Sequence, residues 1–275
     1  MRLYHNLASL NLFAESKKIE AKQSTSLSRI TSGYKINAAK DNPNDLAKSE
    51  KFRMQIRGLQ MAQKNAQDGI SMLQTGEGGM DNITGMVQRI RQLVVQAGDG
   101  ANSQGDITNI NNEINQLTQG IDEIAHNTTF NDVNLLDTNS SGMKAQIGAN
   151  EKESITIPTY DLTSSGLNLN SLDITNPKGI SDALNTIDSS ITTILKARST
   201  YGAIENRFET SINDLGDISD RLDASDSSIR DADIAEEMSE YTKDNILSQA
   251  GNAMMVQSNK LPQDILNVLS EVKAR

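Results

Sequence analysis

The chain has 275 residues, a formal net charge of −10 and only 3% aromatic residues, with no tryptophan. It contains no cysteine, which excludes disulfides and thiolate metal sites. Its two histidines, His5 and His126, leave a zinc site or a Ser-His-Asp triad without its usual parts. We therefore predict no enzymatic activity, no cofactor and no metal, and the lack of a dense basic patch predicts no nucleic-acid binding.

The first predicted element is a helix at the start of the chain, where apolar residues recur at steps of three and four. They are Leu3, Leu7, Leu10 and Ala14. The segment Asp-Asn-Pro-Asn at 41–44 predicts the end of this helix and the start of the next, because proline is tolerated in the first turn of a helix.

A much longer helix is predicted from about Asn44 to Ala97. Its apolar seam is expected at Ile56, Leu59, Gln63, Ala66, Ile70 and Leu73, and then at Met80, Ile83, Val87, Ile90, Val94 and Ala97. A glycine-rich stretch at 76–79 lies between these two sets, and we expect the seam to change phase there. A helix of this length is not stable alone in water and needs partners along its length.

The middle of the chain predicts one more helix and then a small β element. Residues 107–124 keep the helical spacing, whereas residues 128–139 are rich in Asn and Asp and predict a loop. Residues 144–147 and 154–157 predict two short strands joined by a turn. The Ser- and Thr-rich remainder up to residue 178 predicts solvated loop.

Helical spacing returns in the C-terminal half. The expected seam includes Leu184, Ile187, Ile191, Ile194, Arg198, Tyr201, Glu205, Phe208, Ile212 and Leu215. Arg198 and Glu205 are charged residues in this expected seam. Either they set the register of the paired helices at a cost in stability, or the seam is partly exposed at these positions. A last helix carries apolar residues at Leu247, Ala250, Met254, Leu261 and Ile265.

These elements predict a mainly α fold. Long antiparallel coiled-coil-like helices come from both chain ends, and a small β-hairpin element lies in the middle. Residues 1–100 carry a net charge of +5 and the rest −15, which favours pairing of the two ends. We expect this pairing to bury both apolar seams.

No apolar run is long enough to cross a bilayer, so no membrane insertion is predicted. The first residues lack the apolar region of a secretory signal, which predicts a cytoplasmic protein unless a signal-independent export route exists.

Several blocks of the sequence resemble bacterial flagellin, in order and at both ends. They include SLSRITSGYKIN at 26–37, QIRGL at 55–59, NAQDGIS at 65–71, RSTYGAIENRF at 198–208 and the helix at 253–269. The resemblance implies a structural subunit that self-assembles into the flagellar filament for motility. It also implies an N-terminal inner-tube arm (1–43), a rod-like middle domain (44–178 with the β/loop tip, and 179–228) and a C-terminal inner-tube arm (229–275).

The resemblance further implies partners and a location. The chain would be exported through the flagellar secretion apparatus and would end in the extracellular filament. Its partners would be a flagellar export chaperone and the hook-associated and cap proteins. The flagellin-like hook–filament junction protein shares both arms and is an alternative. A secreted module that binds host receptors is another.

The arms have apolar seams too thin for a stable core, so we expect them to fold when identical neighbours supply the missing surface. The predicted self-assembly residues are Leu3, Leu7, Leu10, Leu247, Met254, Leu261 and Ile265.

Arg89, Leu93 and Glu113 match the segment that the flagellin-sensing Toll-like receptor recognises in the family. Arg89 would form charge-assisted hydrogen bonds and Leu93 would pack against the receptor, although packing between subunits fits them as well. The candidate O-glycosylation residues are Ser140, Ser141, Thr163, Ser164 and Ser165, and a plain solvated loop is the alternative.

Overall fold

The computed structural model describes residues 6–137 and 142–273. The chain divides into two compact units. The first, which we call the arm unit, comprises residues 1–54 and 221–275, and the second, the core unit, comprises residues 55–220.

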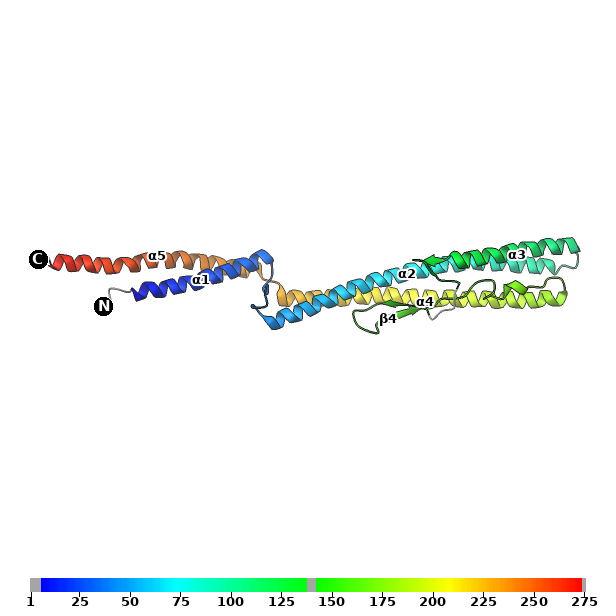
Figure 1. The fold of residues 1–275 in the computed structure, drawn as a ribbon, viewed down its shortest axis with the longest axis horizontal. Coiled ribbons are helices and arrows are strands. Elements are labelled where there is room, and N and C mark those ends of the chain that lie inside the picture. Colours follow the sequence, from blue (N-terminus) through cyan, green and yellow to red (C-terminus); the bar gives the residue numbers. More distant parts are fainter. Residues whose placement is uncertain (1–5, 138–141, 274–275) are drawn as a thin grey trace. The chain divides into compact units, whose positions relative to one another are not determined.

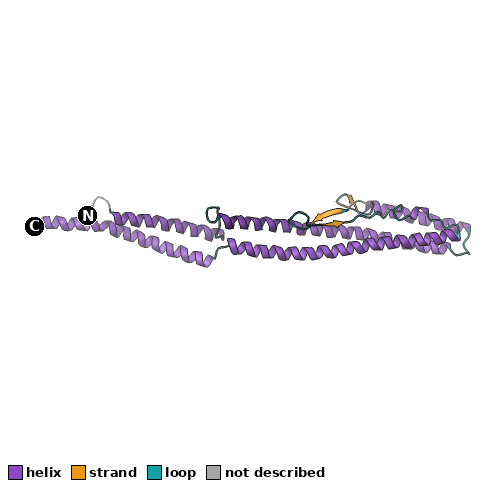
Figure 2. Ribbon diagram, turned by 90° about the horizontal axis from the view of Figure 1, so that it is seen from below, coloured by secondary structure: helices purple, strands orange, loops and turns teal. Residues whose placement is uncertain are grey.

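Long helices dominate both units (Figures 1 and 2). They are α1 (Leu7–Ser32), α2 (Pro43–Ala97), α3 (Gln104–Asn127), α4 (Pro177–Arg230) and α5 (Ile234–Lys273). This confirms the mainly α fold and the long helix ending at Ala97. Hydrogen bonds from Asn6 to Ser258 and from Arg29 to Glu237 place α1 antiparallel to α5. Among the described residues, no helix is long and apolar enough to cross a membrane.

Capping residues mark both ends of α1 and the start of α3. The Asn6 side chain accepts a hydrogen bond from the backbone N–H of Ser9, and Gly33 ends α1 in the left-handed conformation, with φ of 75°. Ser103 and Asp106 form a capping box at the start of α3. These local signals explain both ends of α1 and the start of α3. The first helix ends at Ser32, so the expectation that it ends at residues 41–44 is wrong.

The apolar seam of α2 runs without a change of phase, so the shift expected at 76–79 is wrong. The seam consists of the buried residues Leu59, Ala62, Ala66, Gly69, Leu73, Gly76, Met80, Ile83, Val87, Ile90, Val94 and Ala97, and Met72, Gly79, Thr84 and Leu93 are buried beside it. Ala62 and Gly69 occupy the seam, whereas Gln63 and Ile70 are only half-buried beside it. The steps of three and four are unbroken, as paired helices require.

The seam of α4 also differs from the expected one. Within the core unit its buried positions are Ala183, Ile187, Ser190, Ile194, Ala197, Tyr201, Ile204, Phe208 and Leu215. Arg198 and Glu205 therefore flank the seam and do not interrupt it. Arg198 forms ion pairs with Asp81 at 2.9 Å and Glu77 at 3.4 Å, and Glu205 accepts a hydrogen bond from Gln74. Charges at these positions link α2 and α4 at the edge of the core.

Two glycines of α2 make room for two aromatic rings of α4. A Cβ at Gly76 would lie 2.7 Å from Cε2 of Tyr201, and a Cβ at Gly69 would lie 2.9 Å from Cζ of Phe208. The Tyr201 hydroxyl donates to the carbonyl of Pro158 at 3.0 Å. Burial raises the pKa of Tyr201 to about 12, because the phenolate cannot be solvated there.

The segment between α3 and α4 forms two small sheets. β1 (Thr129–Phe130) pairs antiparallel with β2 (Val133–Asn134), and β3 (Met143–Gln146) pairs antiparallel with β4 (Ser154–Ile157). The second pair confirms the predicted hairpin, with β3 shifted by one residue. The first replaces a predicted loop, since Asn131 and Asp132 both adopt the positive φ of a two-residue hairpin turn.

The segment that follows β4 does not form the solvated loop that its composition predicts. A short 3₁₀ helix spans Leu169–Ser171. Four apolar side chains of the segment are buried in the core unit, namely Leu162, Leu167, Leu169 and Ile174. These apolar residues are isolated and irregularly spaced, so they carry no periodic signal that would indicate a core.

Candidate assembly surface

The interface between α1 and α5 is built largely of small and polar side chains. On α5 the buried and half-buried positions follow steps of three and four: Glu237, Tyr241, Asp244, Ser248, Gly251, Met255, Ser258 and Pro262. On α1 they are Ser9, Leu12, Ser16, Ile19, Gln23, Ser26 and Ile30. Hydrophobic stabilisation scales with buried apolar area, so this interface contributes little of it.

Most of the large apolar side chains that the structure describes on α1 and α5 are exposed, and Leu12, Ile19, Ile30 and Met255 are the half-buried exceptions. The predicted residues Leu7, Leu10, Leu247, Met254, Leu261 and Ile265 are between 36% and 65% exposed. The expectation that pairing of the arms buries their seams is therefore wrong. Leu3 lies outside the described residues. The arms carry further exposed apolar residues that the sequence pattern did not predict as assembly residues. They include Phe13, Leu27, Met238, Ile246 and Val256.

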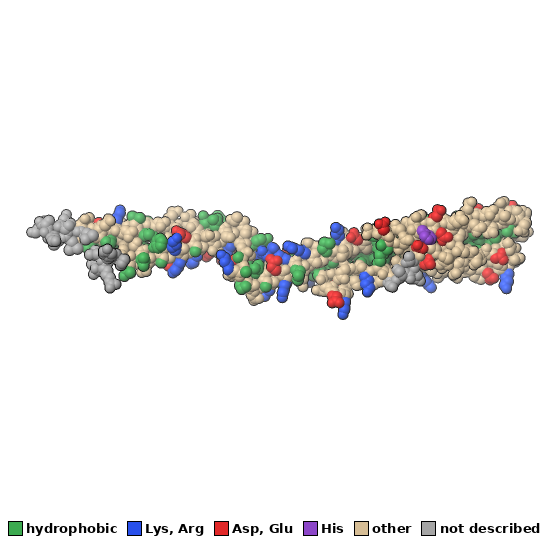
Figure 3. Space-filling model, viewed as in Figure 1, with side chains coloured by type: hydrophobic (Ala, Val, Ile, Leu, Met, Phe, Trp, Pro, Cys, Tyr) green, Lys and Arg blue, Asp and Glu red, His purple; other side chains and the backbone are tan. Residues whose placement is uncertain are grey.

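Figure 3 shows hydrophobic side chains on the surface of the arm unit. Helices with apolar side chains on several faces are normally buried among other helices. Large contiguous apolar patches on a protein surface mark interaction sites. The outer faces of α1 and α5 are therefore the candidate assembly surface.

Ion pairs within the arm unit hold the ends of its helices together. Nη1 of Arg29 lies 2.9 Å from Oε1 of Glu237, and Nε of Arg53 lies 3.0 Å from Oδ2 of Asp226. The Asp226 side chain is buried, and its hydrogen bond raises the pKa of Arg53. A buried carboxylate of this kind requires a paired cation.

The ring of Tyr34 lies at the centre of this group. The guanidinium carbons of Arg53 and Arg230 are 5.5 Å and 4.9 Å from the ring centroid, within the range of cation–π attraction. Two backbone hydrogen bonds, from Lys35 to Arg230 and from Ala232 to Gly33, join the segment after α1 to the end of α4 and the link between α4 and α5. We call Arg29, Tyr34, Arg53, Asp226, Arg230 and Glu237 the junction cluster.

Removing the Arg53–Asp226 pair should destabilise the junction cluster. We expect Arg53→Ala and Asp226→Ala each to lower the free energy of unfolding, with a coupling energy of about 1–2 kcal/mol in a double-mutant cycle. Urea denaturation followed by circular dichroism measures it. The exposed pair Lys48–Asp45 is the matched control, with an expected coupling below about 0.5 kcal/mol. An equal coupling energy in both cycles would show that the Arg53–Asp226 pair does not stabilise the junction cluster.

The structure brings together only two of the three predicted receptor contacts. Nε and Nη2 of Arg89 lie 3.0 Å and 2.7 Å from Oε1 of Glu113, and the two side chains are 50% and 44% exposed. Leu93 is 2% exposed and belongs to the core of its own subunit. Arg89 and Glu113 are therefore the members of this set that a partner can touch.

The predicted glycosylation residues also differ in access. Thr163 and Ser164 are buried, and their hydroxyls donate to Asp161 and Asp122. Ser165 is exposed, although its hydroxyl lies 3.0 Å from that of Thr163. Ser140 and Ser141 lie outside the described residues.

Long paired helices with apolar outer faces define a structural protein whose arms are suited to helix–helix association. The sequence matches the bacterial flagellin N-terminal helical region over residues 3–141 and the bacterial flagellin C-terminal helical region over residues 184–269. The chain belongs to the bacterial flagellin family, a family of structural proteins and not of enzymes.

Named relatives agree with this assignment. The flagellins of Bacillus subtilis and Halalkalibacterium halodurans are each 38% identical to this chain, over 98% of it and 100% of their own length. The flagellar filament 30.7 kDa core protein of Treponema maltophilum is 39% identical over 89% of this chain and 91% of its own.

Solved structures show the same fold. The Bacillus cereus flagellin structure aligns with a TM-score of 0.50 and 29% identity, over 55% of this chain and 88% of its own. A Vibrio parahaemolyticus structure described as flagellar hook-associated aligns with a TM-score of 0.60, over 70% of this chain and 100% of its own. Its identity is 13%, so that likeness concerns the fold alone.

Proposed function

We propose that this chain is a structural subunit that self-assembles into the bacterial flagellar filament and serves motility. The observation that carries the proposal is the pair of outward apolar faces on α1 and α5, in a member of the flagellin family. Neighbouring copies would cover these faces. Head-to-tail packing that does not close on itself produces an open helical polymer.

Removing both arms tests the proposal. We expect a variant without residues 1–30 and 240–275 to stay soluble and to keep the core unit folded, since the core cluster lies outside these residues. It should form no filaments even when seeded with fragments of the full-length polymer, whereas the full chain polymerises. Filaments from the truncated variant, seen by electron microscopy, would contradict the proposal.

The hook–filament junction protein is the less favoured alternative. Relatives that align over nearly the whole chain are named flagellin or flagellar filament core protein. A junction protein would be present only as a small number of copies per filament. Quantitative mass spectrometry of isolated filaments should find this chain as their main component.

We further propose the route and the partners that the family suggests. The chain is exported through the flagellar secretion apparatus, and an export chaperone covers α5 beforehand, because its exposed apolar side chains favour aggregation. In the extracellular filament, hook-associated and cap proteins adjoin the polymer at its ends. Residues 1–43 and 229–275 line the inner tube, and residues 44–178 and 179–228 form the middle domain.

Two surface roles complete the proposal. The exposed Arg89–Glu113 pair is a candidate contact for the flagellin-sensing Toll-like receptor, with Leu93 supporting it from inside the core. Ser165 is the candidate O-glycosylation residue that is exposed among the described ones.

A further inference from the structure

We propose that Met238 and Met254 on α5 are oxidation sites, that their conversion to sulfoxide by a peroxide prevents assembly, and that assembly protects them from oxidation. This inference rests on the proposed function, because it requires that neighbouring copies cover the outer face of α5.

The two thioethers are accessible in the subunit, as are those of Met54 and Met61, while several other methionines are not. The residues Met238 and Met254 are 46% and 59% exposed. Met255, the next residue, is half-buried in the interface with α1, and Met72 and Met80 are buried in the core unit. Methionine oxidation follows exposure, so a mild oxidant distinguishes these groups.

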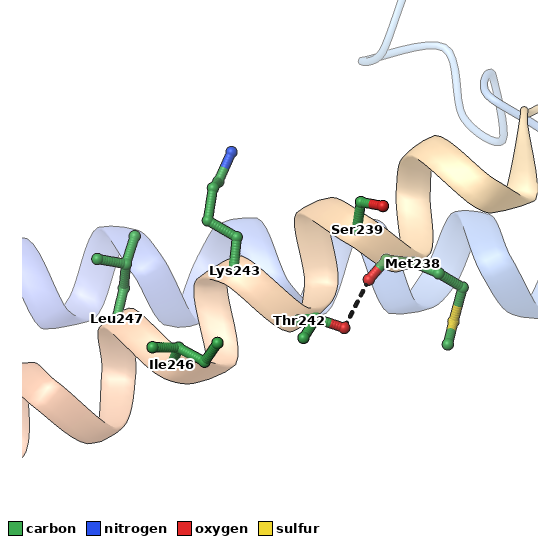
Figure 4. A pocket seen from close by; sticks show the side chains of 6 residues that line it. All are labelled: Met238, Ser239, Thr242, Lys243, Ile246 and Leu247. Atoms are coloured by element: carbon green, nitrogen blue, oxygen red, sulfur yellow. Dashed lines mark hydrogen bonds between the residues drawn. The ribbon is translucent and has the colours of Figure 1, made fainter.

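Met238 lies in a groove of about 570 Å³ on the outside of α5 (Figure 4). The lining residues are Met238, Ser239, Thr242, Lys243, Ile246 and Leu247. The Thr242 hydroxyl already donates to the carbonyl of Met238 at 2.8 Å, and the Lys243 ammonium lies 3.2 Å from Glu240. Ile246 and Leu247 add exposed apolar surface.

Met254 lies one heptad from an exposed leucine on each side, Leu247 and Leu261, so the three side chains share one helix face. An apolar surface that covers this face would offer no hydrogen-bond donor to a new oxygen. The same reasoning applies at Met238, because the Thr242 hydroxyl already donates its hydrogen bond to a backbone carbonyl and the Lys243 ammonium already pairs with Glu240.

The chemical step is an oxygen-atom transfer. The thioether sulfur attacks one oxygen of hydrogen peroxide, the O–O bond breaks, an S–O bond forms and water leaves. The sulfur loses two electrons and the peroxide gains them. The product is a polar acceptor in place of an apolar group.

Burial of an unsatisfied acceptor opposes association. We expect the critical concentration for polymerisation to rise about tenfold for each sulfoxide, the change that corresponds to about 1.4 kcal/mol.

The test treats the unassembled full-length chain with mild hydrogen peroxide, maps sulfoxides by peptide mass spectrometry and measures the critical concentration by sedimentation. Oxidation should occur at Met238 and Met254, and also at the exposed Met54 and Met61, and should spare Met72 and Met80. Methionine sulfoxide reductase should then restore assembly. In preformed filaments Met238 and Met254 should oxidise far more slowly.

Leucine variants identify the residues responsible. The M238L/M254L double variant keeps the apolar volume and should polymerise equally well before and after peroxide. The matched M54L/M61L variant, altered at two other exposed methionines, should remain sensitive.

Three outcomes would overturn the inference: oxidised wild type that polymerises normally, a peroxide-sensitive M238L/M254L variant, or equal oxidation rates in monomer and filament. Failure of the untreated chain to polymerise would overturn the proposed function as well.

Discussion

Replacing Leu10 and Leu247 together with lysine should abolish filament formation while the core unit stays folded. Both leucines are exposed on the arms, at 65% and 44%. Burying a leucine side chain is worth roughly 1.5–3 kcal/mol, and an unpaired buried ammonium is costlier still to desolvate. Because every subunit presents both residues, we expect the critical concentration to rise more than about 100-fold, the effect of about 2.8 kcal/mol.

Sedimentation and electron microscopy measure this loss, and thermal unfolding checks the core unit. The control variant, Leu10→Met with Leu247→Met, keeps the apolar character and the approximate volume of both side chains. It should polymerise near the wild-type concentration. Normal filaments from the lysine variant would show that these faces stay in contact with solvent after assembly.

Replacing Gly76 with alanine should lower the free energy of unfolding of the core unit by about 1–3 kcal/mol. The added Cβ would lie 2.7 Å from Cε2 of Tyr201, which is fully buried and held by its bond to Pro158. The ring has little room to move. The close contact therefore outweighs the gain in helix propensity, which is up to about 1 kcal/mol.

Gly78 provides a matched control two residues away on the same helix. A Cβ there would have no atom within 4 Å, so only the helix propensity changes. Gly78→Ala should stabilise the core unit by about 0.5–1 kcal/mol. Urea denaturation of both variants should therefore give effects of opposite sign. Two effects of the same sign would contradict the account of Gly76 as a position of close approach.

The sequence revealed the seam of α2 only in part. Leu59, Ala66, Leu73 and Met80 are every seventh residue, and all four were recognised because they are apolar. The alternate positions, Gly69 and Gly76, carry no side chain that a periodicity analysis can detect. The glycines therefore looked like an interruption, whereas they are the places where the seam receives rings from α4.

Periodicity likewise could not tell which way an apolar stripe faces. The stripe through Leu7 and Leu10 was detected correctly, but the side of α1 that contacts α5 carries Ser16 and Ser26, which give no apolar signal. The receptor-like segment around Leu93 likewise does not reveal which way its side chain faces, and in the structure it faces the core.

The sequence by itself determined the presence of the long helices, the extent of α2, the second hairpin and the membership in the flagellin family, because these depend on local spacing and on motifs along the chain. Only the tertiary structure decided which faces meet. Partners such as Arg53 and Asp226, or Arg89 and Glu113, lie far apart in sequence. Their contact depends on how the helices pack, and that packing leaves the apolar faces of the arms uncovered in the single subunit.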